Sequence, residues 1–457
     1  MKAYNLIVVI LIIFLNIKGT YHEKCGADKL NIKSMQLDLK PENKKNLASP
    51  ASYTPIKIGF DFTTFIKPSD MSSSTFSKIK AILKETRKEF SKILQVIHEN
   101  FNLTNYKDAI MTNCGLNIIG KNFANFLVTN DLIIFPIFTN LEGGEFASAS
   151  HCLTSGIRPI AGVLYINPNF DSEKTNMGLY LKNILFHEII HILGFNPETL
   201  SEKNMIQTIN SVTYVNSPNV LNKAKSNFGD SAINGVPLED QNGTIGYHWE
   251  SKYMLGDIMT SPDFPEISIS DMTLALLEDT GFYKVNYYSG GFFKFGKNKG
   301  QDFFVKNSIE NNKATFEEFC DTKDEAKCSS SRTFKSSCYI NGSKNYYQNH
   351  CQYGESELPR YYGEKIGANS LCFMSSLVPT SSGEEETKQI PICYESQCSS
   401  DSLIIKIGSE SFTCPSDGGS FTPLGFKGSI TCPKYSDICS STNIICNEMF
   451  SCFTQLA

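Results

Sequence analysis

The feature that most constrains the fold is an apolar stretch from Met177 to Phe195 that contains two histidines and a glutamate. Its apolar residues fall almost all around a helical cylinder, a pattern typical of a helix buried in the middle of a domain. Residues 187–191 read HEIIH, and the i, i+4 spacing places His187 and His191 on one helix face, about one turn apart. We therefore expect a central helix that carries the chemistry of the chain.

Two imidazoles on one face can reach the same metal ion, and Glu188 points about 100° around the helix from His187. From there a carboxylate can hold and deprotonate a metal-bound water without taking a coordination position. A catalytic zinc ion takes three protein ligands and keeps one position open, so a third ligand is required. The bare pattern also arises by chance, as two surface or core histidines on a helix, so the residues around it decide its meaning.

The residues after the motif favour a sharp turn at Gly194, three past the second histidine, where a residue that tolerates positive φ can end the helix. This arrangement is typical of metzincins. Their third histidine would stand at position 197, which is Pro197 here, so the third ligand must come from elsewhere. His248 precedes Met259 by eleven residues, the order in which a Met-turn follows a third ligand. We interpret His248 as that ligand and Met259 as an apolar floor beneath the metal.

These residues resemble the leishmanolysin-like zinc metallopeptidases, in which an insertion separates HExxHxxGF from the third histidine. The similarity extends over roughly 53–290 and, more weakly, into the part rich in cysteine. It rests on HEIIHILGF (187–195), HW (248–249), DIM (257–259), GGEFASASHC (143–152), RPIAGVLYINP (158–168) and SDMTLALLEDTGFY (270–283). The resemblance implies an α+β fold with a metzincin-like catalytic domain. Zinc would lie in a cleft between an N-terminal subdomain with the HExxH helix and a central subdomain with the third histidine and the Met-turn.

The chain is long enough for about two or three domains. Residues 1–19 combine Lys2 with an apolar run and predict a secretory signal peptide; the alternative, an uncleaved anchor, needs about 20 apolar residues. Residues 33–52 are too rich in Lys, Asn, Ser and Pro for a packed element, and we assign 20–52 to a linker or pro-segment. We assign 53–195 to the N-terminal catalytic subdomain, 196–290 to the central subdomain with its insertion, and 291–457 to a disulfide-rich C-terminal domain.

Periodicity predicts several elements inside these ranges. The segment 53–62 alternates like a strand, and 74–98 has the apolar spacing of one long amphipathic helix. Two short apolar runs, 132–138 and 162–168, predict strands of a small mixed sheet, and Pro136 indicates that the first is interrupted or lies at an edge. A further helix is expected around 271–280, whereas 196–246 is polar and weakly patterned.

Fifteen cysteines are present, and twelve of them lie between Cys320 and Cys452. In an oxidising compartment such density predicts disulfides in a loop-rich domain. Structural zinc sites are the alternative, but they favour paired C-x-x-C motifs, and the spacings here are irregular. Three Asn-x-Ser/Thr triplets, at Asn102, Asn242 and Asn341, are candidate glycosylation acceptors.

The odd cysteine count draws attention to Cys25, in the expected pro-segment. If Cys114 pairs with Cys152 and the twelve later cysteines pair among themselves, Cys25 is left over. Its thiolate could then occupy the open zinc position as a latency switch. The alternative is a disulfide from Cys25 to the mature domain, with another cysteine left free.

We predict a secreted, extracellular and monomeric zinc metalloendopeptidase with one zinc ion and with proteins or peptides as substrates. His187, His191 and His248 would hold the metal, and Glu188 would act as general base and then general acid. Lys and Arg total 42 against 47 Asp and Glu, so nucleic acid is not an expected partner. No later segment predicts a membrane span, and the C-terminus lacks the apolar tail of a lipid-anchor signal.

Two other interpretations remain open. The first is a catalytically inactive adhesion module that uses the same fold to bind a surface partner. The second is a gluzincin in which Glu202 or Glu239 is the third ligand, which would leave Gly194, His248 and Met259 without a common explanation.

Overall fold

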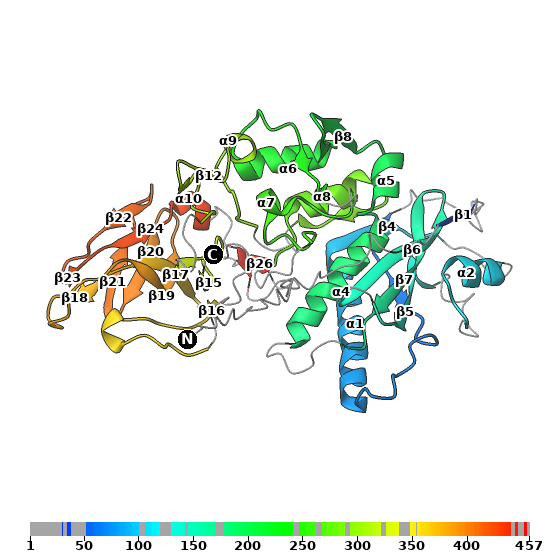
Figure 1. The fold of residues 1–457 in the computed structure, drawn as a ribbon, viewed down its shortest axis with the longest axis horizontal. Coiled ribbons are helices and arrows are strands. Elements are labelled where there is room, and N and C mark those ends of the chain that lie inside the picture. The colour runs from blue at the N-terminus through cyan, green and yellow to red at the C-terminus, as the bar shows by residue number, and fades with distance from the viewer. Residues whose placement is uncertain are drawn as a thin grey trace, which may run out of the picture.

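The computed structural model describes most of the chain, including the whole HExxH helix. The described residues are 30, 34–37, 52–99, 106–118, 129–141, 145–169, 177–240, 246–261, 267–287, 293–320, 326–337, 348–352, 354–439, 444–446 and 452–454. The predicted signal peptide, 1–19, lies outside them. Within these ranges the chain combines helices with several sheets, which confirms the expected mixture. Figure 1 shows a sheet with α1 and α4 at one end, helices α6 to α8 in the middle, and a β-rich region at the other end.

The main sheet has five strands in the order β1-β6-β7-β5-β3. Its strands are β1 (Met35–Leu37), β3 (Ile58–Phe60), β5 (Leu132–Phe138), β6 (Ala147–Ser155) and β7 (Arg158–Ile166). Strands β3, β5 and β7 are parallel, and β6 is antiparallel to β7. The sheet is therefore mixed, as predicted.

Strand β5 corrects the prediction drawn from Pro136. It is continuous and lies between β7 and β3, so it is neither interrupted nor at the sheet edge. The β3 register ends at Ile134, and Pro136 lies beyond it. Because no strand flanks Pro136 on that side, the missing N–H breaks no ladder bond with β3.

Strand β1 corrects the expectation that 33–52 contains no packed element. Residues 35–37 pair in parallel with β6, and Leu37 is buried. Ser34 donates a hydrogen bond to Glu198 at 2.8 Å. Three residues suffice to form this strand because β6 supplies the backbone partners. The polar residues around them dominate the average composition, so the short apolar segment was not apparent in the sequence.

Helices cover both faces of this sheet. Helices α1 (Ser73–Ile93) and α4 (Met177–Leu193) pack on one face, where the rings of Phe90 and Phe186 stack with centroids 3.8 Å apart. Gly162 of β7 allows α4 to approach, because a Cβ there would lie 2.6 Å from Ile192 Cγ2. Helix α2 (Lys107–Asn113) lies on the other face, where the disulfide Cys114–Cys152 ties it to β6.

Helix α1 is shorter than the helix predicted for 74–98. It ends at Ile93, and β4 (Leu94–Ile97) follows directly. This strand joins β2 (Tyr53–Pro55) and β11 (Lys284–Val285) in a small sheet. Leu94 and Val96 are buried with intermediate neighbours, so their alternation fits a strand as well as the helical spacing did.

The polar segment 196–246 is more ordered than its pattern indicates. Its elements are α5 (Pro197–Glu202), β8 (Ile206–Ile209), β9 (Val212–Val215), α6 (Pro218–Phe228) and β10 (Val236–Pro237). Helices α7 (Ser251–Met254) and α8 (Asp271–Asp279) follow, and α8 confirms the helix expected at 271–280. Asp279 accepts backbone N–H groups at the start of α6, which joins the two helices. We call residues 52–287 the metal-site region.

A short connecting part follows, with α9 (Asp302–Val305), β12 (Ile309–Glu310) and β13 (Lys313–Ala314). The cysteine-rich region, residues 326–439, contains two larger sheets and the two-stranded pair of β18 (Val378–Pro379) with β23 (Phe426–Lys427). The first consists of β14 (Ala326–Cys328), β15 (Phe334–Ser337) and β16 (Gln348–His350). The second has the order β21-β20-β19-β17-β24-β22 and contains β17 (Ser370–Ser375), β19 (Ile390–Cys398), β20 (Leu403–Ile407), β21 (Glu410–Thr413), β22 (Gly419–Phe421) and β24 (Ile430–Cys432).

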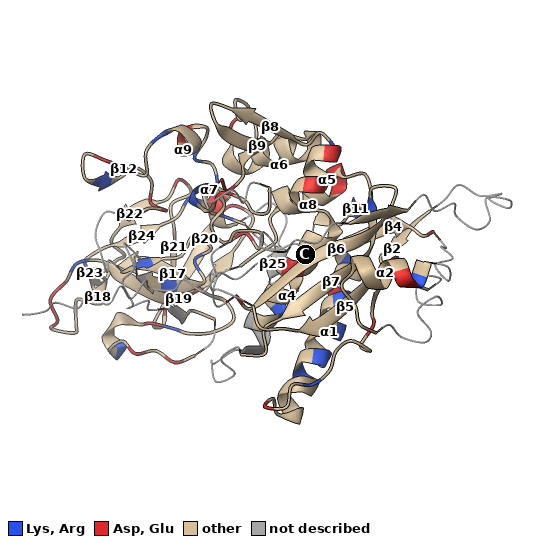
Figure 2. Cartoon of the chain, turned by 45° about the vertical axis from the view of Figure 1, so that its right-hand side comes forward, with Lys and Arg blue, Asp and Glu red and all other residues tan. Residues whose placement is uncertain are grey.

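Smaller elements complete this part of the chain. They are the 3₁₀-helix η7 (Arg360–Tyr362), the strands β18 (Val378–Pro379) and β23 (Phe426–Lys427), helix α10 (Tyr435–Ile438), and the pair β25 (Ile444–Cys446) and β26 (Cys452–Thr454). Among the described residues, no helix combines the length and apolar character that crossing a membrane requires. Acidic and basic residues are scattered over the elements (Figure 2).

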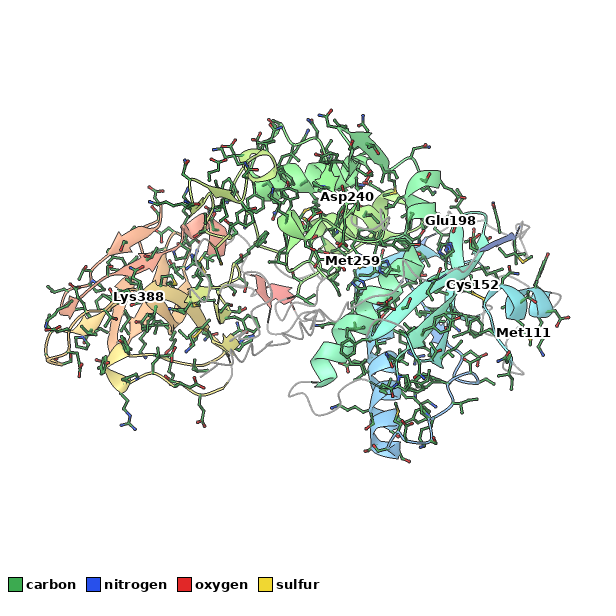
Figure 3. All side chains as sticks on the ribbon, in the orientation of Figure 1. Met111, Cys152, Glu198, Asp240, Met259 and Lys388 are labelled. Carbon is green, nitrogen blue, oxygen red and sulfur yellow. A yellow bond between two sulfur atoms is a disulfide. The ribbon has the colours of Figure 1, made fainter. Side chains whose placement is uncertain are left out.

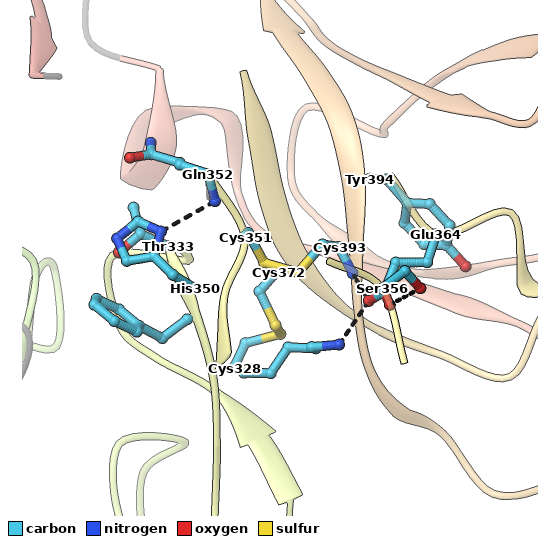
Figure 4. Close-up of a disulfide and its surroundings, with 12 residues drawn as sticks. Cys328, Thr333, His350, Cys351, Gln352, Ser356, Glu364, Cys372, Cys393 and Tyr394 are labelled. Carbon is cyan, nitrogen blue, oxygen red and sulfur yellow. Dashed lines mark hydrogen bonds and ion pairs between the residues drawn. A yellow bond between two sulfur atoms is a disulfide. The ribbon is translucent and has the colours of Figure 1, made fainter. Parts of the chain in front are cut away.

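Disulfides join the two larger sheets of the cysteine-rich region (Figure 4). Cys372 and Cys393 are register partners in β17 and β19. Each bonds to the smaller sheet or its end, Cys372 to Cys328 and Cys393 to Cys351. Two further disulfides are Cys398–Cys439 and Cys414–Cys432. For these cysteines, and for Cys114 and Cys152, the predicted disulfides are confirmed.

Candidate metal centre

Helix α4 is buried on every side along residues 181–193, as its sequence predicts. His187 and His191 lie one turn apart on it, and their Nε2 atoms are 3.0 Å apart. Both rings have almost no solvent exposure. The helix therefore presents two imidazoles to one point inside the protein.

His248 reaches the same point from the segment between β10 and α7. One ligand atom from each of His187, His191 and His248 lies within 4.8 Å of the others, and all three side chains are buried. Among the described residues, this is the group that could hold a metal ion. The structure thus brings together the three histidines singled out in the sequence.

The two alternative carboxylate ligands are placed elsewhere. Glu202 is exposed at the end of α5. The Glu239 carboxylate lies 3.2 Å from Nδ1 of His248. Neither residue belongs to the group of potential ligands, which disfavours the gluzincin interpretation.

Hydrogen bonds on the Nδ1 side orient the first two rings. His187 Nδ1 pairs with the carbonyl of Ile258, and His191 Nδ1 pairs with the carbonyl of Phe195 at 2.8 Å. A carbonyl oxygen can only accept, so each Nδ1 carries the proton and each Nε2 keeps its lone pair. Two such nitrogens 3.0 Å apart repel each other unless a shared proton or cation lies between them.

A turn at Gly194 supplies the Phe195 carbonyl. Phe195 N–H bonds back to the carbonyl of Ile190, and Gly194 N–H bonds to that of His191, the paired bonds of a Schellman motif. Gly194 has φ of 138°, which a side chain would disfavour. A helix-ending turn is thus present at Gly194, and it places the Phe195 carbonyl beside His191.

Glu188, beside His187 on α4, has no solvent exposure. Burying a carboxylate in an apolar setting is costly unless its charge is compensated. A divalent cation held by the three imidazoles would provide such compensation. Neutral imidazole nitrogens, with no thiolate, form a donor set that suits zinc in a catalytic site. The residues present therefore fit a zinc ion.

The loop that carries Met259 is built around Asp257. This buried carboxylate accepts the N–H of Met259 at 2.6 Å and that of Ser270 at 2.9 Å, and burial raises its pKa. The loop also contains Ile258, whose carbonyl holds His187. Met259 is fully buried and belongs to the same apolar cluster as residues of α4. Figure 3 labels Met259 among the central helices.

Trp249 links this loop to His248. Its N–H donates to the carbonyl of Met259 at 3.0 Å, and its indole Nε1–H donates to Thr273 Oγ1 at 2.8 Å. Thr273 in turn donates to Asp257. The HW and DIM motifs stand out in the sequence, but the sequence alone does not assign these contacts of Trp249 and Asp257. The position of Asp257, two residues before Met259, was the available sequence signal for its role in this loop.

Other residues singled out in the sequence lie outside the described residues. These are Cys25, Asn102, Asn242 and Asn341. The latency switch and the glycosylation acceptors therefore stay predictions.

Comparisons with known proteins agree with the motifs. The family model described as leishmanolysin matches residues 79–361 and 339–446. A ciliated left-right organizer metallopeptidase of Danio rerio is 26% identical over 344 residues, 66% of this chain and 54% of the relative. A leishmanolysin homolog of Crithidia fasciculata is 25% identical over 393 residues, 74% of this chain and 59% of the relative. The chain thus spans about half the length of these curated relatives.

Proposed function

Because the chain belongs to the leishmanolysin family, we propose that it is a zinc-dependent endopeptidase that cleaves proteins or peptides. The observation that carries this proposal is the buried convergence of His187, His191 and His248 beside Glu188. Names of relatives support a metallopeptidase, and the donor set supports zinc.

The three histidines would hold one zinc ion through their Nε2 atoms. When bound, zinc would supply Lewis acidity that polarises a peptide carbonyl and makes water more acidic. Glu188 takes a proton from the attacking water, whose oxygen bonds to the carbonyl carbon. As the C–N bond breaks, Glu188 returns that proton to the leaving nitrogen. Met259 and its loop pack against the site, and the carbonyl of Ile258 holds the His187 ring in its orientation.

The proposed architecture follows the sequence assignment: 53–195 as N-terminal subdomain, 196–290 as central subdomain and 291–457 as C-terminal domain, with substrate bound between the first two. Disulfides between described cysteines agree with an extracellular protein, and we propose secretion through the 1–19 signal. An inactive adhesion module would not require a base beside three converging imidazoles.

The test is cleavage of casein by the purified chain with and without a zinc chelator. Glu188→Ala should keep stoichiometric zinc and lose about 10²-fold or more of the activity, because general acid–base catalysis contributes at least that factor. Glu202→Ala, an exposed carboxylate on α5, is the matched control and should match the parent. Parental activity in Glu188→Ala would overturn the mechanism.

A second measurement tests the ligand set. His248→Ala should lose zinc as severely as His187→Ala, because either change leaves two ligands. Elemental analysis of the purified variants gives the stoichiometry. Full zinc occupancy in His248→Ala would remove this residue from the site.

A further inference from the structure

The third histidine differs from the other two in what holds its Nδ1 atom. His187 and His191 use main-chain carbonyls, whereas the Oε2 atom of Glu239 lies 3.2 Å from Nδ1 of His248 in an ion-pair contact. His248 is 3% exposed and Glu239 is 16% exposed, so little water screens the pair. This carboxylate was considered from the sequence only as a ligand.

A short antiparallel ladder fixes the two residues opposite each other. Leu238 and Trp249 form a bridge, Glu239 N–H donates to the carbonyl of His248 at 3.0 Å, and Glu250 N–H donates to that of Pro237 at 3.0 Å. The two bonds flank the Leu238–Trp249 pair, and one of them joins the main chains of Glu239 and His248 directly. The main-chain positions of the two residues are therefore set relative to each other, which keeps their side chains on adjacent strands.

We propose that Glu239 is the positioning residue of the third metal ligand. Its carboxylate accepts Nδ1–H of His248, which fixes the tautomer, aims Nε2 at the other two imidazoles and makes the ring a stronger donor. Carboxylates that bond to metal-binding histidines act in this way, and their loss costs about 10–100-fold in metal affinity or activity. The inference deepens the proposed function and rests on its metal site.

Zinc affinity, measured by competition with a chelator of known affinity, tests this role. Glu239→Leu should raise the zinc dissociation constant about 10–100-fold. Glu239→Gln should fall between Leu and the parent, because its amide oxygen still accepts Nδ1–H but carries no charge. Asp240→Asn removes the same charge at the next residue, which is exposed and is labelled in Figure 3. This variant should stay within about twofold of the parent.

Cobalt-substituted protein gives a second readout. The visible absorption of the bound cobalt should change in both Glu239 variants and stay parental in Asp240→Asn, since the orientation of one imidazole is altered only in the former. A merely structural role would lower thermal stability without changing this spectrum. If Glu239→Leu fails to fold, the isosteric Glu239→Gln variant decides by itself.

Several outcomes would overturn the inference. Equal zinc affinities in Glu239→Gln, Glu239→Leu and Asp240→Asn would show that the carboxylate does not position the ligand. Complete zinc loss in Glu239→Leu together with retained zinc in His248→Ala would make Glu239 the ligand itself. A parent that binds zinc and cleaves casein leaves the proposed function intact in both cases, whereas a parent without zinc overturns both proposals.

Discussion

The metal-site region buries its large apolar cluster between helices and sheets and has one disulfide between described residues, Cys114–Cys152. The cysteine-rich region has a much smaller apolar cluster and four such disulfides. Apolar burial suffices where helices can cover a sheet on both faces. Where strands and loops enclose little volume, covalent bonds restrict the unfolded chain instead.

Reduction of the disulfides should separate the two regions most clearly. Each native disulfide contributes about 2–4 kcal/mol, so loss of four should unfold the cysteine-rich region while the metal-site region stays folded. Hydrogen exchange of the full chain, with and without reductant at neutral pH, measures protection in each region. Equal loss of protection in α4 and β19 would contradict the comparison.

Truncation of one core ring should lower the stability of the metal-site region instead. Phe186→Ala removes the ring that stacks on Phe90 in the middle of the metal-site region and should cost about 3–5 kcal/mol. Chemical denaturation, monitored by hydrogen exchange, should show the loss of stability in α1 and α4. Phe421→Ala, a half-buried ring in β22, is the control, and a larger cost for this variant would argue against the apolar core as the main source of stability.

The cysteine-rich region also buries one ion pair, which tests whether its stability is only covalent. Lys335 and Glu364 lie 2.8 Å apart and are 5% and 1% exposed (Figure 4 shows the Glu364 contacts). Lys335→Met leaves a buried carboxylate without its cation and should cost about 3 kcal/mol in thermal unfolding. Adding Glu364→Gln should recover part of this loss. No effect from Lys335→Met would exclude this ion pair as a source of stability in the cysteine-rich region.

The smallest expected effect is a pH dependence from His350. Burial lowers the pKa of its imidazole to about 4, and its Nδ1 accepts the N–H of Gln352 at 3.0 Å. The unfolded chain, with a histidine pKa of about 6.5, therefore binds a proton that the folded chain does not. Stability should fall as pH drops from about 6.5 towards 4, by no more than about 1 kcal/mol because the side chain is partly exposed.

His350→Asn provides the matched variant for this pH effect. Its side-chain oxygen can accept the same N–H but does not titrate. The melting temperature of the cysteine-rich region, followed from pH 7 to 4.5, should depend less on pH in this variant than in the parent. Identical curves would exclude His350 as the source.

The sequence predicted the centre of the site because its signals are local. HEIIH and Gly194 lie on one helix and its end, and the order of His248 before Met259 identified the third histidine. Glu239 and Asp257 could not be assigned in the same way. Their partners are set by a ladder and a loop whose contacts depend on three-dimensional placement, and an acidic residue alone gives no indication of its partner.

The errors in the predicted fold have a similar origin. Leu94 and Val96 fit both periodicities, so the end of α1 was missed. Helix α6 carries Val220, Ala224 and Phe228 on one buried face, a helical pattern that the polar average of 196–246 concealed. Pro136 is tolerated because β3 ends before it, and the length of a neighbouring strand cannot be read from a single residue.

The Nδ1 acceptors have a consequence for how mutations affect the site. Two of them are main-chain oxygens, at Phe195 and Ile258, and every amino acid carries such an oxygen. Substitutions there alter the rings only by displacing the chain. At Glu239, in contrast, a single codon change removes the acceptor outright. In a saturation-mutagenesis library selected for zinc retention, position 239 should accept few residues, while the acceptor function at 195 and 258 persists whichever side chain is present.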